Sequence, residues 1–353
     1  MLLNILPNTF SFDESLYIKK LHNELLSEAK KNTAKRCLIC DREVKSYCKS
    51  HSVPHFCLRN ISQGKNLNYI NSIIMQPTMK KDQGAGEAGV FYTICNDCDS
   101  KEFLHYENPE LYTEKIDVHI LNEIAKKIYL QEIEKRRYQK NYYELMMKNY
   151  FELYVINNLD ALHKAEINDY EAFSKEYVNL TDNKTKFNIL FYKKLDYVVP
   201  FAFQDDVCLV SDFNGDLINN VYRDSKLQQS MFVCIFPLKE STILLMFCNE
   251  KNNKYRKFKK QFNKLNLENK LKTFLFIMMA YSDNFFFSHS ISNTLLSDEY
   301  VKEISGYTIM SQVVGEERDL EKYKTEAIKE AMMQFNLSKA FKLENYMSIE
   351  YKM

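Results

Sequence analysis

The amino-acid sequence predicts an α+β protein, in which a cysteine-rich segment precedes a helical segment and an antiparallel β-sheet. Two C-x-x-C pairs and four of the seven glycines fall within residues 35–110. After residue 110, apolar residues recur at helical spacing, and after residue 185 short apolar runs alternate with turn residues. We therefore expect an N-terminal helix within residues 1–34, a cysteine-rich domain at 35–110, and an α+β domain of unknown role at 111–353.

Length and charge set broad limits on this protein. A chain of 353 residues fits two domains, or one domain with a large extension. The net charge of +1 does not indicate general attraction to nucleic acid, although it is compatible with a local basic patch. The abundance of Lys, Asn, Ile, Tyr and Phe is typical of an AT-rich bacterial genome.

Segments that direct a chain to a membrane are not expected here. The longest strongly apolar run, residues 274–281, is far shorter than the roughly 18–20 residues of a membrane span. The first ten residues lack the basic start of a signal peptide. We therefore predict a cytoplasmic protein with no membrane partner. In a reducing compartment nine cysteines do not predict a disulfide framework, and the close pairs indicate metal binding or redox chemistry.

The first elements are a helix and a loop. Ser11 and Glu14 fit a capping box, and the helix over residues 11–31 carries apolar residues at helical spacing. These are Leu16, Leu21, Leu25 and Ala29. Within 35–110, the glycine-containing stretch 84–89 predicts a loop. Residues 41–94 leave room for a β-hairpin beside it.

Helices and strands alternate in blocks after residue 108. Isoleucines at 116, 120, 124 and 128 predict helix, which continues to about Tyr177 without Gly or Pro. Strands are predicted at 186–193, 196–203 and 206–213, and Asn214-Gly215 predicts a two-residue hairpin turn. The runs 231–237 and 242–248 predict a second hairpin around Lys239-Glu240. Residues 252–353 are expected to be mainly helical.

Four cysteines predict a structural zinc site. They form two C-x-x-C pairs: Cys37, Cys40, Cys95 and Cys98. Two residues between ligands let one tight turn direct both sulfurs at one ion, and two such turns complete a tetrahedral site. A redox pair would instead follow a strand in a βαβ unit, and no such pattern is present. Cys48 and Cys57 are rival ligands outside close pairs. The remaining cysteines, Cys208, Cys234 and Cys248, lie in apolar runs and are expected in the core.

The residues around the cysteine pairs carry a family resemblance. Ser50-His51 stands between the pairs with Pro54 three residues after the histidine, and Asp99 directly follows the second pair. Aromatic and acidic residues follow at Phe103, Tyr106 and Glu107. Over residues 35–110 this pattern resembles the HNH-type ββα-metal endonucleases, in the treble-clef branch that reads C-x-x-C, S-H-x-x-P, C-x-x-C-D/E.

The resemblance implies roles for particular residues. His51 would act as general base, and Asp99 would hold a catalytic Mg²⁺ or Mn²⁺ ion. Ser50 stands where many HNH enzymes have a metal-binding carboxylate, and the family's middle asparagine is missing. Glu102 or His105 would then complete the metal site from the same helix. The alternative is structural: His51 bonds the loop or ligates zinc, and Asp99 caps its helix.

Two basic groups are candidates for nucleic-acid contact, with DNA favoured over RNA. Lys45, Lys49 and Arg59 bracket His51 in the sequence. A denser group over residues 250–272 includes Lys257, Lys259 and Lys260, opposite an apolar stripe at helical spacing. The alternative for both groups is a solvated surface.

These observations favour a metal-dependent HNH-type nuclease fused to a larger α+β domain, an arrangement that suits restriction or phage defence. Two alternatives stay open. One is a non-catalytic zinc-knuckle module that binds nucleic acid, and the other is a protein-interaction scaffold in which zinc is only a staple. Ser50 favours the alternatives, whereas His51, Pro54 and Asp99 in register favour the nuclease.

Overall fold

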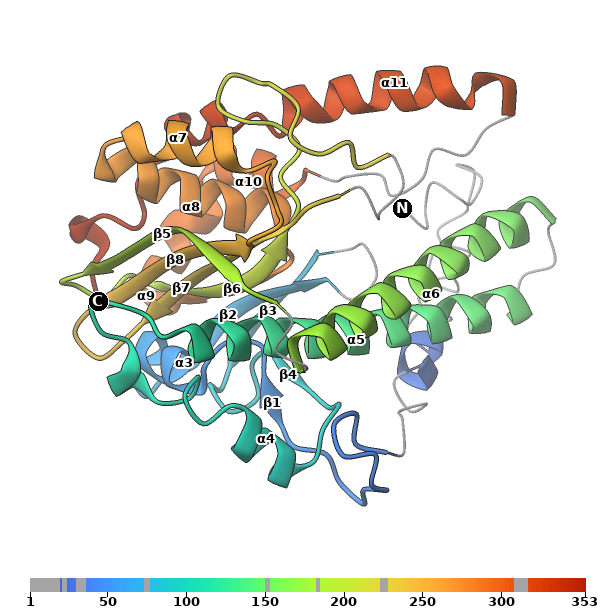
Figure 1. Cartoon of the computed structure of the whole chain (residues 1–353), viewed down its shortest axis with the longest axis horizontal. Coiled ribbons are helices and arrows are strands. Elements are labelled where there is room, and N and C mark those ends of the chain that lie inside the picture. The colour runs from blue at the N-terminus through green and yellow to red at the C-terminus, as the bar shows by residue number, and fades with distance from the viewer. Residues whose placement is uncertain are drawn as a thin grey trace.

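The computed structural model describes residues 20, 24–29, 36–72, 77–149, 153–181, 185–222, 228–307 and 317–353. Its centre is a seven-stranded antiparallel sheet with helices on both faces (Figure 1). The strand order is β3-β2-β9-β6-β7-β8-β5. Their bounds are β2 Leu67–Ser72, β3 Pro77–Gln83, β5 Phe187–Leu195, β6 Phe201–Val207, β7 Met231–Pro237, β8 Thr242–Asn249 and β9 Asn284–Ser288. The predicted α+β class with an antiparallel sheet is confirmed.

The central strands are apolar on both sides because both faces of the sheet are covered. Successive side chains of a strand point to opposite faces. Val233 and Ile235 of β7 enter one core with Met246 of β8, whereas Phe232 and Cys234 enter the other. This double burial explains why residues 231–237 and 242–248 read as continuous apolar runs rather than as alternating ones.

Helices near the C-terminus cover one face. They are α7 Arg256–Lys264, α8 Leu267–Tyr281, α9 His289–Ser297, α10 Glu299–Ser305 and α11 Glu317–Gln334, with the 3-10 turns η3 Leu337–Lys342 and η4 Ile349–Tyr351. Helix α8 is apolar around most of its circumference because it packs between the sheet and the turns that follow α11. Phe258 and Phe262 anchor α7 to the same core.

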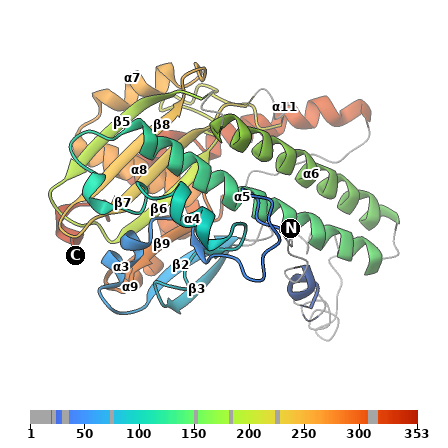
Figure 2. The same cartoon turned by 60° about the horizontal axis from the view of Figure 1, so that its bottom comes forward.

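The opposite face carries the N-terminal segment and two long helices. Its elements are β1 Ser50–His51, α3 His55–Ser62, β4 Val90–Phe91, α4 Asn96–Glu102, η1 Pro109–Leu111, α5 Val118–Asn149 and α6 Leu153–Thr181. Helices α5 and α6 form an antiparallel pair that extends beyond the sheet (Figures 1 and 2). The predicted stripe on α5 is confirmed, since Ile120, Ile124 and Ile128 are buried.

The strand predictions succeed in part. The β7–β8 hairpin and β5 are confirmed. The strand predicted at 196–203 is observed as β6 at Phe201–Val207, so residues 206 and 207 end that strand. Residues 208–213 form no strand of their own: they make one bridge, Ser211 to Leu217, around a turn in which Gly215 has φ +81°. The backbone N–H groups of residues 209 and 210 donate instead to the hydroxyls of Tyr255 and Tyr281. The sequence missed β9 altogether, because its three phenylalanines at 285–287, inside a stretch that reads as helical, are too few to show a period.

The predicted N-terminal helix is visible only in part. Residue 20 and residues 24–29 are helical, and Leu25 and Ala29 pack against Tyr138 and Tyr142 of α5. The proposed capping box at residues 11 and 14 lies outside the described residues, as do Leu16 and Leu21.

The residues on either side of the predicted boundary at 110 share one sheet and one core. Strand β2 pairs with β9, so that residues 67–71 lie opposite residues 284–288. Phe56 and Ile94 of the first segment belong to the same hydrophobic cluster as Phe236 and Phe286 of the second. The cysteine-rich segment is therefore built into the larger domain and is not a separate body.

Gly89 lies where the turn before β4 packs closely against the ring of Phe286 on β9. Its φ is +65°, and a Cβ atom there would lie 2.6 Å from Ser52 Oγ and closer still to the ring of Phe286. Gly64 has a similar φ of +75° with no atom within 4 Å of a Cβ. The two glycines therefore share a backbone constraint and differ in crowding.

We expect Gly89→Ala to lower the free energy of unfolding by about 2–4 kcal/mol, because strain at positive φ adds to overpacking against Phe286. Gly64→Ala should lower the free energy of unfolding by about 1 kcal/mol, since only the backbone strain at positive φ applies there. Chemical denaturation of both variants measures the difference. Equal destabilisation by the two substitutions would show that the atoms around Gly89 move aside for the methyl group without an energetic cost.

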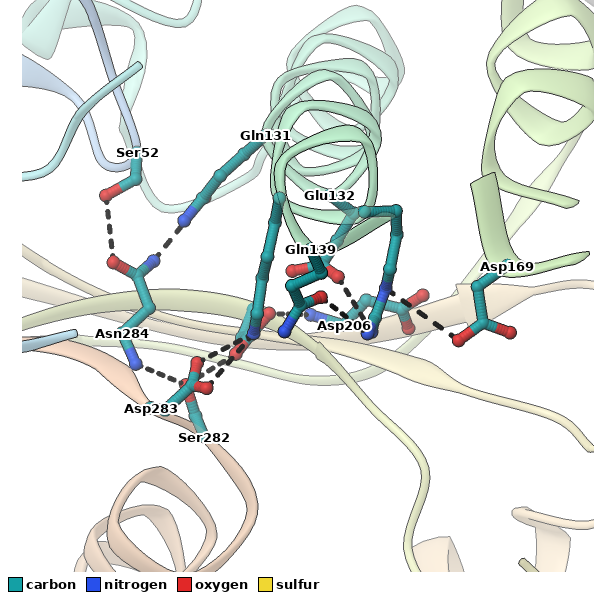
Figure 3. A network of polar contacts seen from close by, with 12 residues as sticks. Ser52, Gln131, Glu132, Gln139, Asp169, Asp206, Ser282, Asp283 and Asn284 are labelled. Carbon is teal, nitrogen blue, oxygen red and sulfur yellow. Dashed lines mark hydrogen bonds and ion pairs between the residues drawn. The ribbon is translucent and has the colours of Figure 1, made fainter. Parts of the chain in front are cut away.

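A polar network joins α5 and α6 to the interior strands β6 and β9 of the sheet (Figure 3). Lys135 of α5 binds Asp283 at 3.0 Å, and Arg136 reaches Glu132 at 3.2 Å. Ser52 donates to Asn284 Oδ1 at 3.2 Å, which connects the loop after His51 to this network. The charges are largely paired within the network, as burial of ionic groups requires.

Asp206 is a poorly satisfied member of this network. Its Oδ1 atom is buried without a partner, and burial raises its pKa to about 7. A carboxyl whose pKa is raised on folding contributes stability that is complete below its unfolded pKa and is lost as pH rises through its folded pKa.

We therefore expect Asp206→Asn to stabilise the protein at pH 8 by on the order of 2 kcal/mol, and to have little effect near pH 4. Denaturation of variant and native protein across this range measures the difference. Asp196→Asn, at an exposed carboxylate, is the control and should show no pH-dependent difference. A gain independent of pH would assign the effect to packing instead.

Candidate functional site

The four predicted cysteines form one cluster. The Sγ atoms of Cys37, Cys40, Cys95 and Cys98 lie within 4.8 Å of one another. The distance between Cys40 Sγ and Cys95 Sγ is 3.9 Å. Zinc–sulfur bonds of about 2.3 Å in a tetrahedron place sulfurs about 3.8 Å apart, so the cluster fits a zinc ion. It is the single group of three or more metal-ligating side chains found in the described residues, and neither Cys48 nor Cys57 belongs to it.

Local structure directs these sulfurs inward. The first pair lies in a tight turn closed by bonds from Asp41 N to Cys37 O and from Cys37 N to Arg42 O. The second pair begins α4, with Cys95 as its N-cap residue. Arg42 donates to Cys40 Sγ at 3.2 Å, and this contact lowers the pKa of Cys40 to about 6. The arginine thus favours the thiolate that a metal requires.

Removal of one thiolate should cost the protein its zinc and much of its structure. Purified protein should contain about one zinc ion per chain, and Cys40→Ser or Cys95→Ser should lose it. Zinc binding to such sites contributes on the order of 10 kcal/mol to folding. Elemental analysis with circular dichroism measures both effects, and Cys208→Ser is the control outside the cluster. Metal-free native protein that is fully folded would contradict the zinc assignment.

The His51–Asp99 site lies next to this cluster. Strand β1 pairs with β4, so that His51 lies opposite Val90. The second C-x-x-C pair lies at the start of α4 and positions this helix next to the two strands. Ser50 Oγ donates to Asp99 Oδ1 at 2.6 Å. Lys127 Nζ, from α5, donates to the same oxygen at 2.8 Å. The sequence placed Ser50 and Asp99 49 residues apart, and the structure brings them into direct contact.

His51 is largely withdrawn from solvent. Its ring stacks on that of His55 with centroids 4.5 Å apart, and its Nε2 atom is buried without a hydrogen-bond partner. Burial, with smaller contributions from His55 and Lys127, lowers the pKa of His51 to about 4. The imidazole is therefore neutral near pH 7, and the unpartnered Nε2 is the atom that could accept a proton.

Lys127 is the functional candidate that sequence reasoning missed. It is 0% exposed, its ammonium pairs with Asp99, and it lies 3.7 Å from the centre of the Phe103 ring. The signal was present: Lys127 follows Ile124 by three residues, which places it on the buried stripe of α5. A lysine on an apolar stripe needs a buried partner.

Glu102 and His105 do not complete a metal site with Asp99, which corrects the expected ligand set. Helix α4 ends at Glu102, so helical spacing does not carry His105 back to the face of Asp99. Glu102 binds Lys126 at 2.9 Å, and His105 Nδ1 lies 2.6 Å from Glu123 Oε1. Each side chain is held by a residue of α5.

A surface pocket of about 490 Å³ opens beside Asp99. Its lining comes from the end of α4 and the turn after it: Asp99, Ser100, Phe103, Leu104, Glu107, Asn108 and Pro109. Glu107 accepts a hydrogen bond from the backbone N–H of His55 at 3.0 Å. Burial raises the pKa of Glu107. This carboxyl therefore ties the start of α3 to the wall of the pocket.

The predicted nucleic-acid contacts fall on two separate surfaces. Lys45, Lys49 and Arg59 are exposed near β1 and α3, although Lys49 pairs with Glu87. On α7, Lys257 pairs with Asp212 and Asp216, and Lys259 donates to the carbonyl oxygen of residue 189. Lys260 is exposed. Because α7 covers the face of the sheet opposite α4, these groups do not form one footprint around His51 (Figure 1).

Comparisons with protein-family models, curated proteins and solved structures find no match to this chain. The geometry of the described residues is thus the basis for any functional conclusion. No helix in the described ranges is both long enough and apolar enough to cross a membrane.

Proposed function

We propose that the His51–Asp99 site hydrolyses phosphodiester bonds in nucleic acid, as the HNH-type resemblance implies, and that residues 35–110 form a treble-clef ββα module. The order of elements supports this proposal. Strand β1 ends at His51, β4 pairs with it, and α4 follows with Asp99 on its first turn. The cysteine cluster joins this helix to the loop before β1.

The observation that carries the proposal is the unpartnered Nε2 of a neutral histidine beside Asp99. Attack on a phosphodiester needs a group that takes a proton from water, and a neutral imidazole does this near pH 7. A bound phosphate would add negative charge next to the ring, which raises the pKa of the imidazole toward the range of an effective base. Lys45, in the loop before β1, and Arg59, on α3, are exposed and offer contacts to the phosphate backbone.

A second candidate is a module that binds nucleic acid without cutting it. The observation in its favour is Ser50, which supplies a hydroxyl and not a carboxylate, and which donates its hydrogen bond to Asp99. In this alternative His51 is a structural residue stacked on His55. Both candidates predict binding, and only the first predicts cleavage.

His51→Ala distinguishes the two candidates. If His51 is the base, the variant should lose cleavage of DNA by about a hundredfold to ten-thousandfold, with zinc content, thermal unfolding and DNA affinity nearly unchanged. Plasmid and single-stranded substrates, DNA and RNA, should be tested with and without Mg²⁺ or Mn²⁺. His119→Ala, at an exposed histidine near the start of α5, is the control.

Two results would count against His51 as the catalytic base. Undiminished cleavage by His51→Ala would exclude this residue as the base. Loss of zinc or unfolding of the variant would make His51 structural and would favour the binding module.

A further inference from the structure

We propose that the ammonium group of Lys127 takes the place of a divalent metal ion in the His51–Asp99 site. Asp99 then pairs with this ammonium, whereas the corresponding carboxylate of the HNH-type nucleases binds a metal ion. The part of this inference that concerns cleavage rests on the proposed function. The part that concerns metal binding stands on the contacts around Asp99. Lys127 is on this view a positioning residue, because its buried ammonium does not reach the pocket.

The groups that surround Asp99 do not form a binding site for Mg²⁺ or Mn²⁺. Its Oδ1 atom already accepts hydrogen bonds from Ser50 at 2.6 Å and Lys127 at 2.8 Å. A Mg²⁺ ion sits about 2.1 Å from each of six oxygens, and usually takes one or two carboxylates. An ammonium in contact with the same oxygen would repel such an ion. Among the described residues, no group of three or more metal-ligating side chains includes Asp99.

The other carboxylates of the site are also engaged. Glu102 pairs with Lys126, and Glu123 is bound by His105 and by the backbone N–H of Tyr106 at 2.7 Å. Glu107 accepts the N–H of His55. A divalent ion at Asp99 would therefore have to bind Oδ2 next to the Lys127 ammonium or displace that ammonium, and would have to recruit a carboxylate from an existing bond.

The burial of Lys127 shows that its pairing with Asp99 is built into the fold. The lysine is 0% exposed, and its ammonium has the Asp99 carboxylate and the Phe103 ring as neighbours. A buried ammonium without a partner is strongly disfavoured, so the lysine and the carboxylate stabilise one another's charged state. The same charge lies close enough to His51 to lower its pKa, which helps to keep the imidazole neutral.

Two properties follow for the native protein. Asp99 should not bind Mn²⁺, and cleavage supported by His51 should not require Mg²⁺ or Mn²⁺. Removal of the lysine charge should reverse the first property, because Asp99 is then a partly buried carboxylate without its cation.

The test measures Mn²⁺ binding to zinc-loaded protein by electron paramagnetic resonance. Native protein and Asp99→Asn should bind Mn²⁺ equally, since Asp99 contributes no site. Lys127→Met should bind Mn²⁺ at least tenfold more tightly than native protein, and Lys127→Met/Asp99→Asn should lose this gain. Met has a length similar to that of Lys without its charge, and the double variant is the matched control for folding.

The decisive comparison uses proteins that keep Lys127, so it does not depend on the folding of Lys127→Met. A Mn²⁺ site in native protein that disappears in Asp99→Asn would overturn the inference. Cleavage by native protein that requires Mg²⁺ or Mn²⁺ and is lost in Asp99→Asn would also overturn it. Absence of cleavage by native protein under every condition would remove the proposed function, whereas the Mn²⁺ comparison would still decide this inference.

Discussion

Four sulfurs held within 4.8 Å of one another fix the geometry on which the candidate site depends. One pair lies in the turn before β1 and the other at the start of α4, so a single ion bound by all four would set the helix against the strand. Strands β1 and β4 are only two residues long, and such a short ladder does not hold a helix in place by its own hydrogen bonds. The contact between Ser50 and Asp99 follows from this constraint.

Helix α5 supplies the second constraint. Three of its charged residues, Glu123, Lys126 and Lys127, each bind the segment that begins at Asp99. Breaking a buried pair by removing one partner typically costs about 3–5 kcal/mol. The site is therefore enclosed between α4, which begins at the cysteine cluster, and α5, which belongs to the larger domain. This enclosure accounts for the burial of His51 and Asp99.

Local signals in the sequence predicted much of this structure. The C-x-x-C spacing identified all four clustered cysteines, and helical spacing identified the buried face of α5. What failed were features that depend on partners distant in the chain. Strand β9 is a strand because β2 and β6 flank it, and no local pattern shows this. Glu102 and His105 shared helical spacing with Asp99, but α4 ends before that spacing applies, and α5 provides competing partners.

The pairing of β2 with β9 has a consequence for biosynthesis. Residues 52–89 lie between the two strands of the β1–β4 hairpin, and they contain β2, whose neighbour β9 is made only after residue 283 has been added to the chain. During translation the N-terminal segment thus emerges with a sheet edge that lacks its partner. Closing a contact over so long a stretch is slow relative to local folding. The four cysteines can come together early, whereas Phe286 can pack against Gly89 only after β9 has been made.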